Sequence, residues 1–376
     1  MSRQATQPDL SKEPIMSLTS YVSLGRSGLR VSPFALGTMT FGQEWGWGAD
    51  APTSQAILAR YLELGGNFID TANGYTFGHA EKIIGDYIGK DRALRDRLVL
   101  ATKFGMNLYT GDPNGGGASA KAITRACEQS LRRLQTDYID LYWMHVPDQG
   151  TPIEETLRTL ENLVTSGKVR YIGFSDTPSW KVAQAQTIAS MRGWTTLAGL
   201  QLEYSLLERS VEAELMPMAQ ELGLGVVVWS PLANGMLSGK YTRANAGNVD
   251  GSRATQFGLP FGEREFAIID ALTGIANKHE TTVAAVALAW VRARTGVSST
   301  LLGARTVAHL DSNVKALDVR LTVEDIAQLD SLSEPPMSFI TKMAGLADVV
   351  IHHSTTVNGH TSPAWWGAPT SDAARY

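Results

Sequence analysis

Short apolar runs alternate with segments of helical periodicity along most of the chain. The runs that predict strands lie at 34–38, 67–71, 97–102, 139–144, 169–174, 199–204, 225–229 and 299–303. The segments that predict helices lie at 54–64, 79–89, 119–134, 153–166, 179–191, 211–222, 263–278, 282–294 and 306–316. Strands that alternate with helices pair in parallel, and eight of them close a barrel more naturally than an open sheet. The pattern therefore predicts an α/β fold, a (β/α)8 TIM barrel.

The predicted barrel occupies residues 21–334 and shows no break that would divide it into two domains. It begins with a β-hairpin at 21–32, where two short apolar runs flank a turn that contains glycine. Residues 1–20 are polar and contain no apolar core of a secretory leader. We expect them to form a disordered tail.

Two long glycine-rich loops interrupt the alternation, at 105–117 and 233–262. Both follow a predicted strand, so both are expected on the functional face as lids or pocket walls. The last segment, 335–376, reads as an irregular extension that contains two adjacent tryptophans. It either covers the substrate pocket or is simply a tail.

Composition excludes several classes of protein. Of the 376 residues, 43% are hydrophobic and 19% are charged, which is enough to form a large core under a charged surface. The net charge of −4 and the absence of a basic block argue against nucleic acid or an anionic membrane as a partner. No apolar run is long enough to span a bilayer. The single cysteine, Cys127, cannot form an internal disulfide, so we expect a cytoplasmic protein.

Several common site motifs are missing. No Gly-x-Gly-x-x-Gly follows a strand, which argues against a Rossmann dinucleotide site. The stretch 235–240 resembles a phosphate loop, but it has one residue too few between its glycines and no Ser or Thr after Lys240. The seven histidines show no spacing typical of metal ligands, and no Gly-x-Ser-x-Gly elbow is present.

Four proton-handling side chains follow three consecutive predicted strands. Asp70 and Tyr75 come after one strand, Lys103 after the next and His145 after the third. Taken singly, each is more often structural: a turn cap, a packing tyrosine, a solvated lysine or a core histidine. Because all strands of a parallel barrel end at one face, the four are expected to meet there.

Together these groups suit proton donation to a carbonyl oxygen. An ammonium beside a phenol favours the phenolate and lowers its pKa from about 10. A carboxylate keeps that ammonium charged where it is partly buried, and a histidine orients the carbonyl. Because the side chains supply no hydride, this chemistry requires a nicotinamide cofactor.

The chain resembles a known family, the aldo-keto reductases, from residue 21 to about residue 332. It most resembles the bacterial members that are related to sugar and aryl-alcohol reductases and to potassium-channel β subunits. The matching stretches are LGRSGL at 24–29, LGTMTFG at 36–42, NFIDTANGY at 67–75, ATK at 101–103, DLYWMH at 140–145, GKVRYIG at 167–173, QLEYS at 201–205, WSPL at 229–232 and GART at 303–306. The resemblance implies a barrel whose bottom is capped by the N-terminal hairpin, with NADPH lying across the C-terminal face.

The resemblance also implies roles for residues. Tyr75 would donate the proton, Lys103 and Asp70 would tune it, and His145 would orient the carbonyl. The cofactor would be bound by residues at the ends of five strands, namely Gly37, Thr38, Met39, Ser175, Asp176, Gln201, Trp229, Ser230, Leu232, Gly235, Leu237, Gly239, Lys240, Gly303, Arg305, His309, Ser312 and Asn313.

The predicted binding of the adenosine end of the cofactor also has a physical basis that is independent of the family resemblance. Arg305 stands at a predicted helix start after Gly303, where a helix N-terminus and a guanidinium both attract phosphate, and this favours NADPH over NADH. Three departures from the family pattern are present. Asp176 replaces an asparagine, and His309 and Ser312 replace a glutamine and a glutamate, so discrimination against NADH is left open.

Aromatic residues on the loops around the four groups predict a pocket for an aldehyde or ketone with an apolar or ring-shaped body. The expected lining is Trp47, Phe77 and Trp143, with Trp45, Tyr109 and Trp365 or Trp366 as further candidates and Asp148 as a hydroxyl ligand. The main alternative is an NADPH-binding partner or regulatory subunit with little turnover, and a further one is a barrel enzyme that acts without nicotinamide. The oligomeric state stays open.

Overall fold

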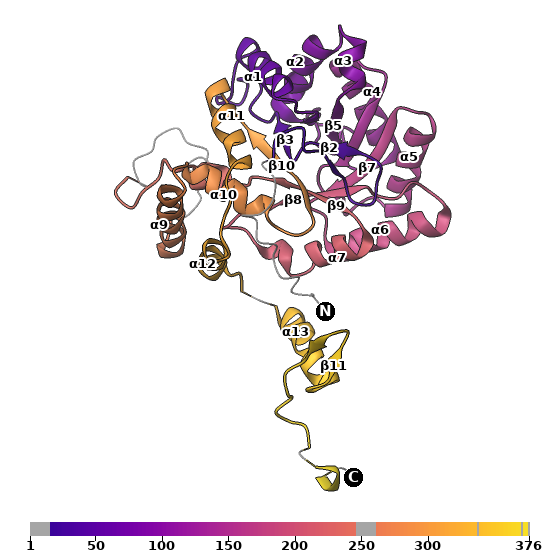
Figure 1. Cartoon of the computed structure of the whole chain (residues 1–376). Coiled ribbons are helices and arrows are strands. Elements are labelled where there is room, and N and C mark those ends of the chain that lie inside the picture. Colours follow the sequence, from indigo (N-terminus) through magenta and orange to yellow (C-terminus); the bar gives the residue numbers. More distant parts are fainter. Residues whose placement is uncertain (1–15, 246–260, 337, 370, 375–376) are drawn as a thin grey trace.

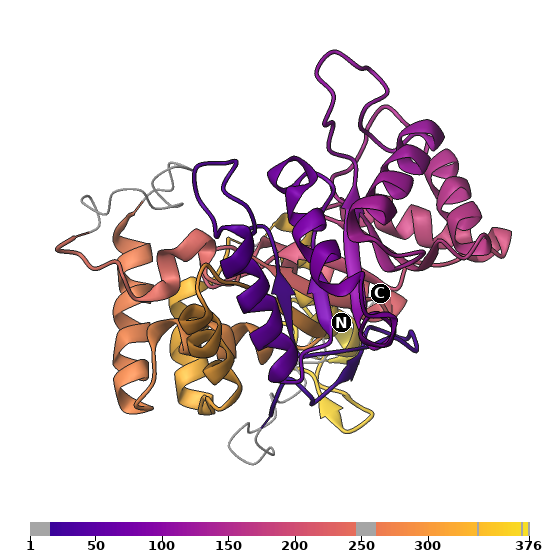
Figure 2. The same cartoon turned by 90° about the horizontal axis from the view of Figure 1, so that it is seen from above.

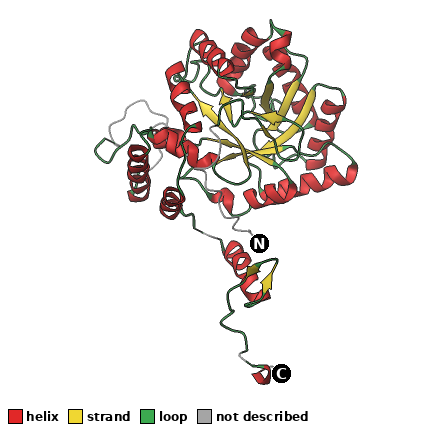
Figure 3. Cartoon of the chain, viewed as in Figure 1, coloured by secondary structure: helices red, strands yellow, loops and turns green. Residues whose placement is uncertain are grey.

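Eight parallel strands close into a barrel in the computed structural model, which describes residues 16–245, 261–336, 338–369 and 371–374. Figure 3 shows these strands at the centre of a ring of helices. Each strand pairs with its neighbour along the chain, and the last strand closes against the first. In chain order the strands are β3 (Phe34–Gly37), β4 (Phe68–Asp70), β5 (Val99–Phe104), β6 (Ile139–Met144), β7 (Val169–Ser175), β8 (Gly199–Glu203), β9 (Gly225–Trp229) and β10 (Val297–Gly303). The predicted (β/α)8 barrel is confirmed.

The nine predicted helices are all present around the barrel (Figures 1 and 2). They are α1 (Ala51–Glu63), α2 (His79–Ile88), α4 (Ala120–Leu134), α5 (Ile153–Thr165), α6 (Ser179–Arg192), α7 (Leu215–Leu222), α9 (Glu263–Lys278), α10 (Val283–Arg292) and α11 (Val307–Val314). Three further helices were not predicted, namely α3 (Arg92–Asp96), α12 (Val323–Ser333) and α13 (Phe339–His352). In the part of the chain that the structure describes, no helix combines the length and apolar character needed to cross a membrane.

The strands carry two separate cores on their two faces. One set of alternate residues forms a small core inside the barrel, which includes Ala35, Phe68, Val99, Ala101, Leu141, Trp143, Val227 and Leu301. The residues between them pack outward against the helices in a much larger core. Because side chains along a strand alternate with a period of two, the residue two positions after Phe68 and the one two positions after Ala101 also face inward. These are Asp70 and Lys103.

The N-terminal hairpin closes the bottom of the barrel. Its strands β1 (Val22–Ser23) and β2 (Arg30–Val31) are antiparallel, and Leu24 between them is fully buried in the inner core. The backbone N–H of Arg26 donates to the carbonyl of Gly223 at 2.8 Å. Gly25, with φ of +57°, lies against the first residue of β9. The expected cap is confirmed, and it depends on close backbone contact that only glycines permit.

The two ends of the chain differ in part from the expectation. Residues 1–15 of the predicted disordered tail lie outside the described residues. Residues 16–20 are ordered against the barrel instead, because Leu18 is buried in the outer core.

The extension 335–376 is not wholly irregular. It contains α13 and a small hairpin of β11 (Thr356–Val357) and β12 (His360–Thr361). Phe339, Met343, Leu346 and Val350 recur at helical spacing, so the sequence contains a signal for this helix that the prediction missed. Figure 1 shows the segment leading away from the barrel past α12. Trp366 is 94% exposed, and Trp365 is partly exposed.

The hairpin cap predicts a large cost for a single methyl group. A Cβ added to Gly225 would lie 2.5 Å from the N of Gly25 and 2.6 Å from a methyl of Leu24. We expect Gly225→Ala to lower the free energy of unfolding by about 2 kcal/mol through overpacking. Gly274→Ala in α9 is the control, since its Cβ would meet nothing within 4 Å, and it should be neutral or stabilise by about 0.5–1 kcal/mol. Urea unfolding of both variants tests this, and equal stabilities would contradict the close contact.

Candidate active site

A lysine with no access to solvent lies at the centre of the C-terminal end of the barrel. Lys103, on β5, is completely buried, and its Nζ donates to three acceptors. These are Asp70 Oδ1 on β4, the carbonyl of Thr71 at 2.9 Å and the Tyr75 hydroxyl at 3.1 Å. An ammonium has three N–H donors, so every one of them has a partner. The structure thus brings together three of the four predicted proton-handling residues.

The carboxylate of Asp70 is held at both oxygens. Oδ1 accepts from Lys103, and Oδ2 accepts from Gln201 Nε2 at 2.8 Å. Gln201 lies on β8, is 2% exposed and was predicted as a cofactor ligand. Its contact with Asp70 was not predicted, although the alternation along β8 could have pointed to it, because Gly199 and Gln201 share the inward face.

Burial and pairing act against each other on the pKa values of this ion pair. Burial raises the pKa of Asp70, with Lys103 and Gln201 opposing the rise. Burial alone would lower the pKa of Lys103, but the charge of Asp70 and the bonds to Asp70 and Tyr75 outweigh it and raise that pKa. The pKa of Lys103 is raised because its attraction to Asp70 dominates, and the pKa of Asp70 is raised because the loss of contact with water dominates. The site therefore holds Lys103 as an ammonium.

The phenol of Tyr75 behaves differently from the sequence-based expectation. Lys103 does favour the phenolate, but burial is the larger effect and raises the pKa of Tyr75. The expected net lowering is therefore wrong for the protein without bound ligands. Tyr75 carries its proton at neutral pH, which is the state that a proton donor needs.

Two residues after Tyr75 adopt left-handed backbone conformations that are uncommon outside glycine. Thr76 has φ of +45° and Phe77 has φ of +58°. The Thr76 hydroxyl donates to the carbonyl of Phe41 at 2.9 Å and accepts from the N–H of Ala80 at 3.0 Å, which fixes the turn. Such strain persists only where the surroundings enforce it. Here it turns Phe77 outward, where 67% of it is exposed beside the site.

A group of aromatic rings reaches the Tyr75 ring through Trp45. Trp45 lies edge-on to Tyr75 with ring centroids 6.2 Å apart, and edge-on to Phe77 at 6.4 Å. Trp47 lies 5.6 Å from Trp45. Trp47 and Phe77, both predicted to line the substrate pocket, therefore join the candidate proton donor in one aromatic group through Trp45.

His145 completes the set beside the phenol. Its ring lies 5.7 Å from that of Tyr75, at an interplanar angle of 81°. Burial and the nearby charge of Lys103 lower the pKa of His145 to about 3, so the imidazole is neutral at pH 7. Its Nδ1 is buried and has no hydrogen-bond partner among the described residues. The neutral imidazole can donate one hydrogen bond and accept one.

Other predicted pocket residues have structural roles. Trp143 is fully buried in the inner core against Gly173 of β7, so it does not form an open pocket wall. Asp148 accepts bonds from Ala118, Gly150 and Thr151 at 2.7–2.8 Å, which hold its own loop and leave no role as a hydroxyl ligand. Tyr109 stacks on Arg125, with the guanidinium carbon 3.8 Å from the ring centroid.

A carboxylate and an indole are joined across the ends of β7 and β9. Asp176, with φ of +43°, accepts from Trp229 Nε1 at 3.1 Å on Oδ1 and 3.0 Å on Oδ2. The hydroxyl of Ser175 donates to Oδ2 at 3.0 Å, and the backbone N–H of Glu203 donates to Oδ1 at 3.3 Å. Three of the predicted cofactor residues, Ser175, Asp176 and Trp229, are thus brought together, and their mutual bonds were not predicted.

The loop after β9 turns repeatedly. Left-handed conformations occur at Ser230, Ala233, Asn234, Gly235 and Gly239. The N–H groups of Ala233, Gly235 and Leu237 donate to backbone carbonyls within the loop, and that of Asn234 donates to the Ser230 hydroxyl, so these groups hold the loop itself. Lys240 follows and is exposed, whereas Leu237 is fully buried and can contribute only through its backbone.

The predicted adenosine end lies beyond β10. Arg305 is exposed just before α11, whose first turn is capped by Thr306 accepting from the N–H of His309 at 3.2 Å. The remaining predicted cofactor residues divide by exposure. One group is exposed or partly exposed and consists of Gly37, Met39, Leu232, Gly303, His309 and Ser312. The other two residues are buried: Thr38 donates to the backbone carbonyl of Asp70, and Asn313 donates to that of Gly303.

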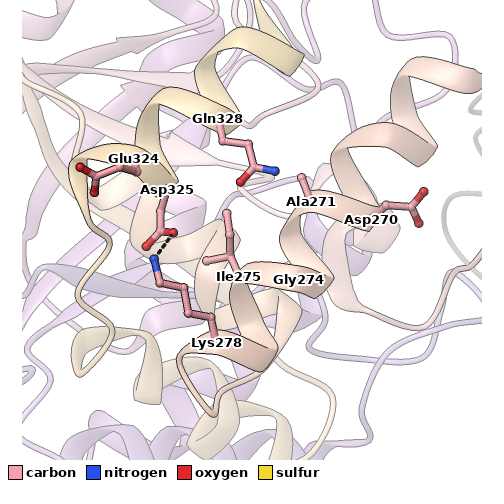
Figure 4. A pocket seen from close by; sticks show the side chains of 8 residues that line it. All are labelled: Asp270, Ala271, Gly274, Ile275, Lys278, Glu324, Asp325 and Gln328. Carbon is pink, nitrogen blue, oxygen red and sulfur yellow. Dashed lines mark hydrogen bonds and ion pairs between the residues drawn. The ribbon is translucent and has the colours of Figure 1, made fainter.

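A hollow lies between α9 and α12, and its polar groups have structural roles (Figure 4). Its polar groups already bind one another, with Lys278 donating to Asp325 at 2.9 Å. Asp325 also accepts at 3.0 Å from the N–H of Thr322, the N-cap of α12. These bonds hold the pKa of Asp325 down at about 2, although burial opposes them.

Comparisons with known proteins agree with this geometry. The chain matches the model of the aldo/keto reductase family over residues 33–334. It is 40% identical over 325 residues to an uncharacterized oxidoreductase of Bacillus subtilis, covering 84% of this chain and 96% of the relative. It is 33% identical over 331 residues to an aryl-alcohol dehydrogenase of Pestalotiopsis microspora, covering 86% and 84%. It is 36% identical over 312 residues to a norsolorinic acid reductase of Emericella nidulans, covering 81% and 79%. The chain belongs to the aldo-keto reductase family of oxidoreductases.

Proposed function

We propose that the protein catalyses the reversible, NADPH-dependent reduction of an aldehyde or ketone, with Tyr75 as the proton donor. The observation that carries the proposal is the buried ammonium of Lys103, whose three donors bind Asp70, the Thr71 carbonyl and the Tyr75 hydroxyl. A partner protein that only bound a nucleotide would gain nothing from this arrangement, which is costly to bury.

The residues present fit a nicotinamide dinucleotide. Trp229, fixed by Asp176, offers an indole plane beside the four groups, and Ser175 lies next to it. Lys240 and Arg305 offer cations for the phosphates, with Arg305 suited to bidentate binding at the 2′-phosphate. When bound, the cofactor supplies the hydride that no side chain can supply.

The protein's own groups would handle the proton. Tyr75 would release its proton to the carbonyl oxygen, and the adjacent Lys103 ammonium would stabilise the phenolate that results. Asp70 and Gln201 would keep Lys103 in place. His145, neutral at pH 7, would hold the carbonyl oxygen by hydrogen bonding without adding a charge. Acid catalysis of this kind is worth roughly 10²–10⁴ in rate.

The aromatic rings around Tyr75 support a substrate with an apolar or aromatic body. Trp45 lies against Tyr75, Trp47 and Phe77 lie against Trp45, and all three rings carry no charge. One relative is named for aryl-alcohol oxidation and another for reduction of norsolorinic acid. We infer that aromatic aldehydes and ketones are the substrate class to test first.

The role of Tyr75 can be tested with a matched pair of variants. Tyr75→Phe should reduce kcat by roughly 10²–10⁴, because the proton donor is lost, while NADPH binding stays within about threefold. Tyr109→Phe removes a hydroxyl that lies outside the four groups and should leave kcat unchanged. Steady-state reduction of aromatic aldehydes measures both. If Tyr75→Phe turns over like the unmodified protein, the mechanism is wrong. If the unmodified protein binds NADPH but reduces no carbonyl, the regulatory alternative gains support.

The preference for NADPH can be tested at Arg305. NADPH should quench tryptophan fluorescence through Trp229, and Arg305→Ala should weaken NADPH binding by about 10–100-fold, because charge-assisted hydrogen bonds are lost. NADH binding should not change. Arg26→Ala, in the hairpin at the other end of the barrel, is the control. Equal loss of NADH and NADPH binding in Arg305→Ala would argue against a contact to the 2′-phosphate.

The neutral state of His145 predicts how stability depends on pH. Its pKa is about 3 when folded, against about 6.5 when unfolded. Between these values the unfolded chain binds more protons, so the folded state loses stability as pH falls from 6.5 toward 3. From pH 6.5 to 5, His145 should account for a loss of about 2 kcal/mol that His145→Gln lacks. Urea unfolding at several pH values measures the difference. A constant difference between the two proteins would show that His145 titrates normally.

A further inference from the structure

The carboxylate of Asp176 is fully committed to accepting hydrogen bonds. Its two oxygens accept from Trp229 Nε1, from the hydroxyl of Ser175 and from the N–H of Glu203. A carboxylate has only acceptors, whereas an asparagine amide would place two donors at one of these positions. These donors suit a carboxylate rather than an amide and stabilise its ionised form, in which Asp176 places a negative charge at this point.

This charge lies within electrostatic reach of the catalytic groups. The negative charge of Asp176 contributes to raising the pKa of Tyr75, and the positive charge of Lys103 contributes to lowering that of Asp176. Burial is the larger effect on Asp176 and raises its pKa, while the bonds from Trp229 and Ser175 oppose the rise. The carboxylate and the proton donor thus belong to one electrostatic environment.

The local balance of charge is negative. Lys103 is neutralised by Asp70, so no free cation among these groups offsets Asp176. Glu203, on β8 beside Asp176, is affected in turn. Burial and the charges of Glu208 and Asp176 raise the pKa of Glu203 to about 7. A group that entered this space with a positive charge would be attracted, and a neutral group of the same shape would not.

We propose that Asp176 makes this site prefer the oxidised, positively charged form of the nicotinamide over the reduced, neutral form. The inference rests on the proposed function, in which the nicotinamide lies against Trp229. The bonds to Trp229 hold the carboxylate at the edge of the indole and keep the charge beside the stacked ring. Asp176 is thus a residue that sets the preference between the two oxidation states, separate from the residues that transfer the proton.

The consequence concerns the direction of the reaction. Tighter binding of NADP⁺ relative to NADPH favours alcohol oxidation on the enzyme and slows release of NADP⁺ after carbonyl reduction. A tenfold change in the ratio of the two dissociation constants equals a shift of about 30 mV in the midpoint potential of the bound two-electron couple.

The test compares dissociation constants for NADP⁺ and NADPH by tryptophan fluorescence and by calorimetry. Asp176→Asn removes the charge and keeps the size of the side chain. It should change the ratio of the two constants by about tenfold in favour of NADPH, which is the effect of one nearby charge in a partly solvated site. Asp318→Asn removes an exposed charge outside the site and should leave the ratio unchanged.

A second variant distinguishes the effect of the Asp176 charge from that of its hydrogen bond with Trp229. Trp229→Phe keeps Asp176 but removes its indole donor. It should weaken both forms of the cofactor and retain most of the preference for NADP⁺. If Asp176→Asn binds both forms with an unchanged ratio, or weakens both equally, Asp176 is merely structural and the inference fails. If the unmodified protein binds neither form, the proposed function fails instead.

Discussion

A single buried ion pair organises the catalytic end of this barrel. Lys103 has no exposed surface and depends on Asp70 for the charge that makes burial tolerable. Removing one partner of such a pair leaves an uncompensated charge, which typically costs 3–5 kcal/mol. The chain commits further groups to it, since Gln201 fixes the second carboxylate oxygen and the Thr71 carbonyl takes a lysine proton. The result of these contacts is a charged lysine held beside a protonated tyrosine.

The same alternation along the strands produces both the inner core and the site. Phe68, Ala101 and Leu141 fill the barrel lower down, and residues two or four positions later on the same faces carry the chemistry. The functional side chains therefore lie directly after the apolar layer of the inner core, toward the C-terminal ends of the strands. The aromatic rings that flank Tyr75 come from loops and from a strained turn, so recognition and proton transfer are built from different parts of the chain.

Much of this was predictable from local pattern. Eight apolar runs and nine periodic segments predicted the barrel, because strands and helices bury faces with different periods. The grouping of Asp70, Tyr75, Lys103 and His145 followed from their positions at strand ends. The sequence could not show which effect dominates the pKa of Tyr75, because burial depends on distant residues that pack around the phenol. For the same reason, Trp143 could not be distinguished as a core residue, although it sits on the inward register with Leu141.

The hairpin that caps the barrel also constrains how the chain reaches this fold. The cap near Arg26 bonds to Gly223, and β3 pairs with β10 through contacts such as Phe34 with Thr300. Both contacts join the start of the chain to its second half. Contacts between distant residues form late because long loops must close first. During synthesis, then, β3 can pair with β4 early, but the hairpin must wait for Gly223 and the other edge of β3 must wait for β10, so closure of the sheet belongs to the final stage of folding.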